Sequence, residues 1–397
     1  MGAAAWYYYL SLLIVGMGVE FGYYYLQLHK AHPDSGTRTD MLSCYANWDG
    51  RWYQRIASDG YTYSQDHMSS VVFFPLYPKI ASVLIRVFGL RSEVALLIVS
   101  HTALIGAFYL FLRYLRIRRG NASDDDVSNS LLAFAFFPMT FFMRMTYTES
   151  LCVLLLIASL YAMATRKPLI FTAVLITLAI LTRSVGAALV PVFVWHIWKC
   201  SRNKRDFLGK CAIYVPICFA SLAFYMWYLD AAFGNMMAFS DAQIHWKLRE
   251  DVVTLGDRLW CLLKLEPILD NFNPERSTWW AGDPRFGHID WLNIRLVNLF
   301  WFFVTVTILL IGWRRRILLP NELILSAFLL LIPIMTIGVT QGMTSMGRYV
   351  TIIFPVYIVL GRWLSGCSPR AMSMYTSVSI LFMFIYSSLF AAWHWYY

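Results

Sequence analysis

The chain has 397 residues, of which 59% are hydrophobic and only 14% are charged. A soluble domain carries about 25% charged residues, so the composition excludes an ordinary soluble enzyme. The formal net charge of +10 does not indicate nucleic-acid binding, because the positive residues cluster in short loops between apolar runs, as in membrane proteins that follow the positive-inside rule.

Apolar runs of about 17–25 residues recur along the whole chain and predict an all-α polytopic membrane protein. The first run, residues 4–28, is too long for a signal-peptide core, and we expect it to remain as an anchor. We predict a single integral membrane domain, residues 1–397, with about eleven transmembrane helices. They are expected near 4–28, 93–113, 128–145, 149–165, 168–182, 185–199, 209–231, 291–312, 321–340, 348–364 and 371–393.

Five basic loops set the expected orientation. These candidate cytoplasmic loops lie at 113–126, 166–167, 199–210, 314–316 and 366–370. With the N-terminus inside, all five lie in the cytoplasm only if residues 29–92 make no net crossing. Segment 29–92 is then a first outer loop, and the C-terminus lies outside. The sequon at Asn121 would lie in the cytoplasm and carry no sugar.

The apolar run 71–90 must therefore not span the membrane. Lys79, Ser82 and Arg86 follow the spacing i, i+3, i+7, a polar stripe typical of a helix lying in the membrane interface. The alternative is a short spanning helix with two cations that reach toward water. In that case every later loop would change sides.

Residues 47–61, with the sequence NWDGRWYQRIASDGY, predict a short helix outside the hydrocarbon. Asn47 is a favourable N-cap, Asp49 lies in the first turn, and Gly60 supplies the stop. Asp49 is either a catalytic carboxylate or a residue that only stabilises the helix start.

Three further charged residues interrupt or border apolar runs. Arg183 lies within about thirty apolar residues and would either bind a phosphate as a planar fork or reach outward from a tight turn. Glu149 begins a helix that Thr146 or Thr148 would cap, and capping alone is a sufficient explanation for it. Arg348 opens the next-to-last predicted helix and would otherwise be an interface anchor.

The loop 232–290 is too long for a plain connector. It contains an amphipathic stretch at 251–263, and four tryptophans lie in or beside the loop: Trp246, Trp279, Trp280 and Trp291. These aromatic residues would form either the usual interfacial belt or a lid over the acceptor.

The sequence offers no cofactor or metal motif. It has no Gly-rich phosphate loop, no HExxH and no CxxC, and the seven cysteines show no paired spacing. We therefore predict no metal site, no cofactor and no disulfide framework.

The motif at 47–61, followed by FFPLYP at 73–78, resembles the PIG-V family of GPI mannosyltransferase II enzymes and their prokaryotic relatives. This family is part of the GT-C glycosyltransferases. Three shorter matches follow in the same order: YTES at 147–150, TRSVG at 182–186 and Arg348-Tyr349. The loop 232–290 matches nothing in the family.

The resemblance implies a GT-C-like fold with membrane-parallel helices in the first outer loop. It also implies inverting transfer of mannose from polyprenyl- or dolichyl-phosphate mannose to a lipid-linked glycan acceptor, by an α1,6 linkage to a GPI-precursor-like glycolipid. Asp49 would be the catalytic base, and Arg183 and Arg348 would bind the donor phosphate. Trp48, Trp52, Tyr147 and Glu149 would bind or orient the substrates. The site would lie on the non-cytoplasmic face, of the endoplasmic reticulum in a eukaryote or of the plasma membrane in a prokaryote.

Other interpretations remain open from the residues alone. The chain could be a GT-C transferase that uses another polyprenyl-phosphate sugar. It could also be a lipid transporter with Arg183 and Glu149 as coupling charges, although no internal repeat is visible. A non-catalytic glycolipid-binding subunit that keeps the fold is the third alternative. The sequence leaves open whether a small partner subunit takes part.

Overall fold

The computed structural model describes residues 2–28, 39–118, 123–247, 251–276, 279 and 294–394. The sequon at Asn121, Trp280 and Trp291 lie outside these ranges. The described residues form α-helices, short 3₁₀-helices and turns, without a β-strand. This agrees with the predicted all-α class.

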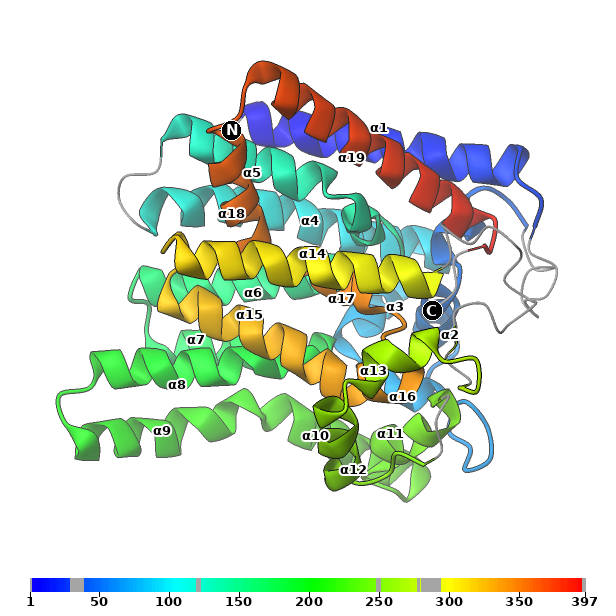
Figure 1. The fold of residues 1–397 in the computed structure, drawn as a ribbon. Helices are drawn as coiled ribbons and strands as arrows, with labels where there is room; N and C mark the ends of the chain where they lie inside the picture. Colours follow the sequence, from blue (N-terminus) through cyan, green and yellow to red (C-terminus); the bar gives the residue numbers. More distant parts are fainter. Residues whose placement is uncertain are drawn as a thin grey trace.

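The helices run side by side and form one elongated bundle, with short helices gathered at one end (Figure 1). The long elements are α1 (Gly2–Tyr24), α4 (Ser92–Ile117), α5 (Asp124–Phe136), α6 (Glu149–Ala164), α7 (Leu169–Thr182), α8 (Leu189–Cys200), α9 (Lys204–Cys218), α10 (Ala220–Phe233), α14 (Ile294–Arg314), α15 (Pro320–Pro333), α18 (Pro355–Leu364) and α19 (Pro369–Ala391). The short helices at the other end include α2 (Asp49–Ser58), α3 (Leu76–Phe88), α11 (Ala238–Asp241), α12 (Leu255–Leu263), α13 (Glu266–Leu269), α16 (Val339–Gln341) and α17 (Met346–Thr351).

The first and last helices of the chain, α1 and α19, pack against each other. Small residues allow their backbones to approach closely. A Cβ added to Gly18 would meet the Ser387 hydroxyl, and one added to Gly22 would meet the Ser388 carbonyl. Close backbone approach at small residues is a principal source of helix association in membranes.

By length and composition, five described helices are able to cross a membrane, or seven if each bent pair is one span. This is fewer than the eleven predicted. Helices α6 and α7 have only 16 and 14 residues, about 24 and 21 Å at 1.5 Å per residue. The predicted helix 348–364 is broken into α17 and α18, because Pro355 has no backbone N–H to bond the Thr351 carbonyl, which accepts from the Tyr357 hydroxyl instead.

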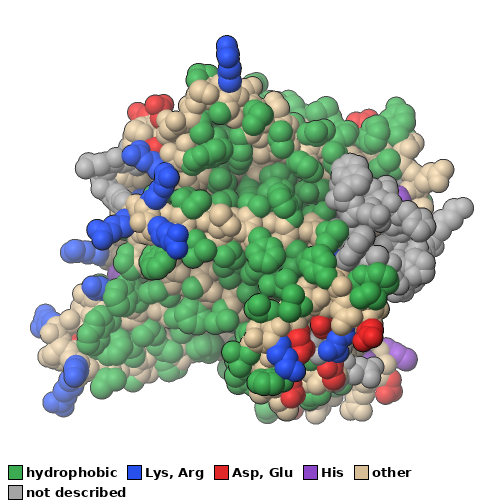
Figure 2. All heavy atoms as spheres, in the orientation of Figure 1, with side chains coloured by type: hydrophobic (Ala, Val, Ile, Leu, Met, Phe, Trp, Pro, Cys, Tyr) green, Lys and Arg blue, Asp and Glu red, His purple; other side chains and the backbone are tan. Residues whose placement is uncertain are grey.

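The loops at one end of the bundle are the basic ones. The connections α6–α7, α8–α9, α14–α15 and α18–α19 lie on the left of Figure 1, as do the N-terminus, the end of α4 and the start of α5. Figure 2 shows lysine and arginine side chains gathered at the same end, while hydrophobic side chains cover the sides of the bundle. The short helices α2, α3 and α17 lie at the opposite end.

Helix α3 has 13 residues, about 20 Å, and is too short to cross a hydrocarbon layer of about 30 Å. Lys79 and Arg86 are exposed as expected, but Ser82 is buried. The predicted stripe of three polar residues is therefore wrong at its centre. The exposed face of α3 also carries Val83 and Val87, which lie beside the two cations.

Candidate active site

The site begins at α2, whose first residue is Asp49. The preceding residue, Trp48, has a φ of 58° and a ψ of −125°, an unfavourable backbone conformation for a bulky residue. The expected N-cap is wrong: Asn47 does not cap α2, because its amide donates to the carbonyls of Phe390 (3.0 Å) and Ala391 (3.1 Å). The start of α2 is thereby fastened to the end of α19.

A second carboxylate, Glu149, is the first residue of α6 and is fully buried. The expected threonine caps are also absent. The Thr146 hydroxyl donates to the Tyr45 carbonyl at 3.1 Å, and Thr148 makes no capping bond. Capping therefore does not explain why these residues surround Glu149.

Two arginines contact this carboxylate. The Arg183 guanidinium donates to Oε1 of Glu149, and Nε of Arg348 lies 2.5 Å from the same oxygen. Nη1 of Arg348 also donates to Oδ2 of Asp49 at 2.5 Å. The four candidate residues thus form one chain of ion pairs. Asp49 and Arg348, the first and last of them, are 299 positions apart in the sequence. Their side chains are 0–18% exposed, with Asp49 the most accessible.

The other oxygen of Glu149, Oε2, is buried and accepts no hydrogen bond. A second buried carboxylate, Glu322, shows what a purely structural site looks like. It accepts bonds from Arg118 and Tyr114 on one oxygen, and from the Leu319 amide on the other. Because buried carboxylate oxygens without donors are costly, Oε2 of Glu149 differs from the oxygens of a carboxylate whose role is structural.

Arg183 owes its position to the corner between α7 and the 3₁₀-helix Ser184–Ala188, where its backbone is extended. Gly186 makes this corner possible. A Cβ on Gly186 would meet backbone atoms of Ala179 and would lie 2.7 Å from the Ile180 nitrogen.

We therefore expect Gly186→Ala to destabilise the protein by about 1–3 kcal/mol, as overpacking against backbone does, and to lower its thermal midpoint in detergent. The control is Gly209→Ala in α9, where nothing lies within 4 Å and helix propensity favours alanine. Equal midpoints for both variants would contradict the close packing of this corner.

Arg348 follows a backbone segment with several unusual conformations. The end of the α15 span is a π-helical turn, Ile334–Gly338, and Gly342, Met343 and Ser345 have φ values of 57°, 63° and 69°. Non-glycine residues with positive φ are uncommon, and such strain concentrates at functional sites. The same observation holds for Trp48 beside Asp49.

Tyr349 is a site residue that the sequence interpretation left without a role. The Arg183 guanidinium lies over its ring at 4.3 Å, and the Arg348 guanidinium lies 5.9 Å from the ring centre. Tyr147 faces Arg348 from another side, at 4.9 Å. The two rings attract both cations electrostatically and help to hold two like charges side by side. The adjacent dipeptide Arg348-Tyr349 was the available signal.

We expect Tyr349→Leu to weaken binding of polyprenyl phosphate about thirtyfold, since a desolvated cation–π contact is worth about 2 kcal/mol. Tyr349→Phe retains the ring and should bind nearly as well as the wild type. Titration of the purified protein with the lipid phosphate separates these outcomes, and equal losses in both variants would assign the effect to the hydroxyl.

The predicted aromatic residues are divided between two surroundings. Trp48 is buried and packs against Trp393 with ring centres 5.0 Å apart, so it lies in the core. Trp52 is partly exposed. Its ring centre lies 5.4 Å from that of Trp246 and 6.0 Å from that of Phe73. Trp246 comes from the loop 232–290, which therefore contacts α2.

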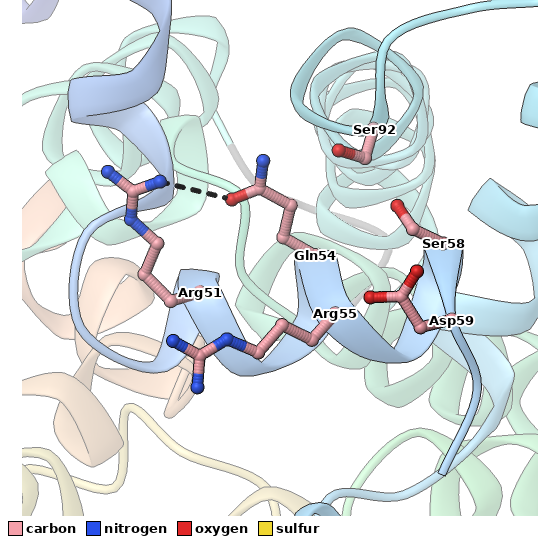
Figure 3. A pocket seen from close by; sticks show the side chains of 6 residues that line it. All are labelled: Arg51, Gln54, Arg55, Ser58, Asp59 and Ser92. Carbon is pink, nitrogen blue, oxygen red and sulfur yellow. Dashed lines mark hydrogen bonds between the residues drawn. The ribbon is translucent and has the colours of Figure 1, made fainter. Parts of the chain in front are cut away.

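A polar surface hollow of about 240 Å³ lies beside α2 but is not the place where these charges meet. It is lined by Arg51, Gln54, Arg55, Ser58, Asp59 and Ser92. Figure 3 shows Arg51 and Gln54 projecting from α2, joined by a bond of 3.5 Å. At 3.6 residues per turn, Arg51, Arg55 and Ser58 lie on the opposite face of α2 from Asp49.

Within the described ranges, no three His, Cys, Asp or Glu side chains come together as metal ligands. The independence from a metal ion stays a prediction. None of the seven cysteines, which all lie in the described ranges, forms a disulfide.

Comparison with known proteins identifies the fold. No family model matches the chain, and no characterised protein matches it by sequence. Its structure is similar to that of ArnT from Cupriavidus metallidurans bound to undecaprenyl phosphate, with a TM-score of 0.50 and 14% identity. The match covers 94% of this chain and 62% of that chain.

A further similar structure is the apo form of the Archaeoglobus fulgidus oligosaccharyltransferase. The TM-score is 0.44 with 13% identity, over 98% of this chain and 56% of that chain. The chain thus spans less than two thirds of the length of these two structures. The likeness to ArnT confirms the predicted fold class, a polytopic GT-C fold. Membership of the PIG-V family stays a prediction.

Proposed function

We propose that the chain is an inverting GT-C glycosyltransferase that transfers one sugar from a polyprenyl phosphate to a hydroxyl group of a lipid-linked acceptor. The observation that carries this proposal is the ion-pair chain in which Arg348 bridges Asp49 and Glu149 while Arg183 contacts Glu149. It joins a partly accessible carboxylate to two cations suited to a phosphate, within a GT-C fold.

Asp49 is assigned the role of general base. It would accept the proton of the acceptor hydroxyl from within about 2.6–3.2 Å. The hydroxyl oxygen forms the new bond to the anomeric carbon, and the bond from that carbon to the phosphate oxygen breaks. The bonding electron pair remains on the phosphate, so the phosphodiester becomes a phosphomonoester.

Arg183 and Arg348 would bind the phosphate on which negative charge accumulates. The two arginines, Asp49 and Glu149 together have a formal charge of zero. Adding the donor phosphodiester gives −1. After transfer, the phosphate has gained one negative charge and Asp49 one proton, so the total is still −1. The buried site therefore avoids a net change in charge during the reaction.

Glu149 is a positioning residue in this scheme, because a single oxygen contacts both arginines. Its second oxygen would accept a bond from a sugar hydroxyl. Trp52, with Trp246 beside it, would contact the acceptor. The Tyr147 ring would hold the Arg348 guanidinium in place by a cation–π contact.

The finer assignment is mannose from polyprenyl- or dolichyl-phosphate mannose, with a GPI-precursor-like acceptor and an α1,6 linkage. The ordered motifs at 47–61, 73–78, 147–150, 182–186 and 348–349 support it. The basic loops opposite α2 support a site on the non-cytoplasmic face.

The test is a transfer assay with the purified full-length protein, labelled polyprenyl-phosphate mannose and a lipid-linked acceptor. The proposal expects the label on the acceptor, with inverted anomeric configuration. A transporter would leave the sugar on its carrier, and a binding subunit would retain both lipids unchanged. Transfer from another polyprenyl-phosphate sugar alone would keep the reaction class and reject mannose.

A further inference from the structure

Helix α12, Leu255–Leu263, belongs to the loop 232–290 and has two very different faces. Its start is fixed by a capping box: Thr254 accepts a bond from the Asp257 amide at 3.1 Å, and the Asp257 carboxylate accepts one from the Thr254 amide at 2.7 Å. With nine residues it is about 14 Å long. It is therefore a stable short helix that cannot cross a bilayer.

One face of α12 packs against the end of a candidate membrane span, Pro320–Gln341. Cys261 and Val252 are buried in contact with Val339 of that span. The Arg258 guanidinium donates to the carbonyl of Met335, in the π-helical turn, at 3.2 Å. These contacts place α12 beside the last two turns of this candidate span.

The opposite face is apolar and exposed. Leu255, Leu259, Trp260 and Leu263 are 66%, 48%, 58% and 77% exposed. At 3.6 residues per turn they occupy one side of the helix. A contiguous face of this kind is unfavourable in water and indicates an interaction surface.

The geometry points to the lipid bilayer as the partner of this face: we infer that α12 lies in the plane of the membrane surface, with these four side chains in the acyl region. Lys264 supports a bilayer rather than a protein partner. Its ammonium lies over the Trp260 ring at 4.9 Å, and a tryptophan with a neighbouring cation is the usual anchor at the lipid interface.

This placement has a consequence for the rest of the chain. The same span that α12 contacts continues into the turn Gly342–Ser345 and then α17, which carries Arg348. The bilayer would thus hold the segment before Arg348 at the membrane surface. The inference about α12 itself does not depend on the proposed reaction.

The test is the accessibility of a nitroxide spin label in lipid nanodiscs of phosphatidylcholine and phosphatidylglycerol. Cys200, Cys211 and Cys367 are replaced by serine, because the other four cysteines are buried. The full-length protein then carries a single label at Leu263→Cys or, as a control, at Glu275→Cys, which is exposed in the same loop.

We expect the label at 263 to be reached by oxygen several-fold better than by a water-soluble nickel chelate, and the label at 275 to show the reverse. Nickel access at 263 equal to that at 275 would overturn the inference and leave α12 as a lid in water. Protection from both reagents at 263 would also overturn it, because a second copy or a partner subunit would then cover the face. Since both substituted positions are exposed, neither change threatens folding.

Discussion

Asp49→Asn is expected to abolish sugar transfer and, at the same time, to tighten binding of polyprenyl phosphate. The loss should be about 10²–10⁴-fold, the usual contribution of a general base. The gain in binding follows from the contact between Asp49 and Arg348 at 2.5 Å. A phosphate that binds Arg348 must compete with the Asp49 carboxylate for the guanidinium. The asparagine amide of the variant is uncharged and binds the guanidinium less strongly, so the phosphate should bind more tightly.

The expected gain in affinity is about fivefold, since a partly buried ion pair of this kind is worth on the order of 1 kcal/mol. Titration of wild type and variant with polyprenyl phosphate, without acceptor, measures it. Asp59→Asn is the matched control, because Asp59 follows the same helix and lines the surface hollow instead. It should change neither transfer nor binding.

The two readouts separate different failures. Transfer at a near wild-type rate by Asp49→Asn would remove Asp49 from the chemistry. If transfer is lost but lipid affinity is unchanged, the role of Asp49 as general base is supported, and its competition with phosphate for Arg348 is contradicted. If wild-type protein bound no polyprenyl phosphate at all, the proposed donor would be wrong.

Arg183→Lys is expected to lower transfer about 10²–10³-fold, the effect of removing one preorganised donor at a developing charge. Lysine keeps the positive charge but loses the planar fork. It also cannot lie flat over Tyr349, where Arg183 lies at 4.3 Å, while contacting Glu149. The loss should appear in kcat as well as in donor KM, because the arginine acts on the phosphate as it leaves.

Arg362→Lys serves as the control for this change. Arg362 lies at the basic end of the bundle, and its pair with Asp126 is largely exposed on the arginine side, so the substitution should be silent. A similar loss in both variants would indicate general damage. A change in thermal midpoint for Arg183→Lys without a change in rate would make Arg183 structural.

The sequence singled out the four charged residues that form the ion-pair chain, but not their contacts. Asp49, Glu149, Arg183 and Arg348 could be selected because charges in or beside apolar runs need a reason. The pairing of Arg348 with Asp49 depends on tertiary packing, which no local pattern contains. For the same reason the caps were wrong: Asn47 finds carbonyls of α19 and Thr146 one of residue 45, partners far away in the chain.

More spans were predicted than the five to seven described helices that are long enough to cross a membrane. The difference lies mainly in α6, α7 and α8, which are apolar but short, because hydropathy does not register where an apolar run turns. Proline marks several of these turns: α7 follows Pro168, and α17 and α18 are separated before Pro355. Proline removes a backbone donor and restricts the preceding residue. Tyr349 was given no role of its own, because a tyrosine next to Arg348 in the sequence is common. Only the fold brings Arg183 over its ring.

The most direct measurement is an experimental structure of the full-length protein with polyprenyl phosphate bound. The account predicts the phosphate between Arg183 and Arg348, with Arg348 separated from Asp49 and Asp49 open toward the acceptor side. A phosphate bound elsewhere, for example in the hollow lined by Arg51 and Arg55, with the contact between Asp49 and Arg348 intact, would contradict it.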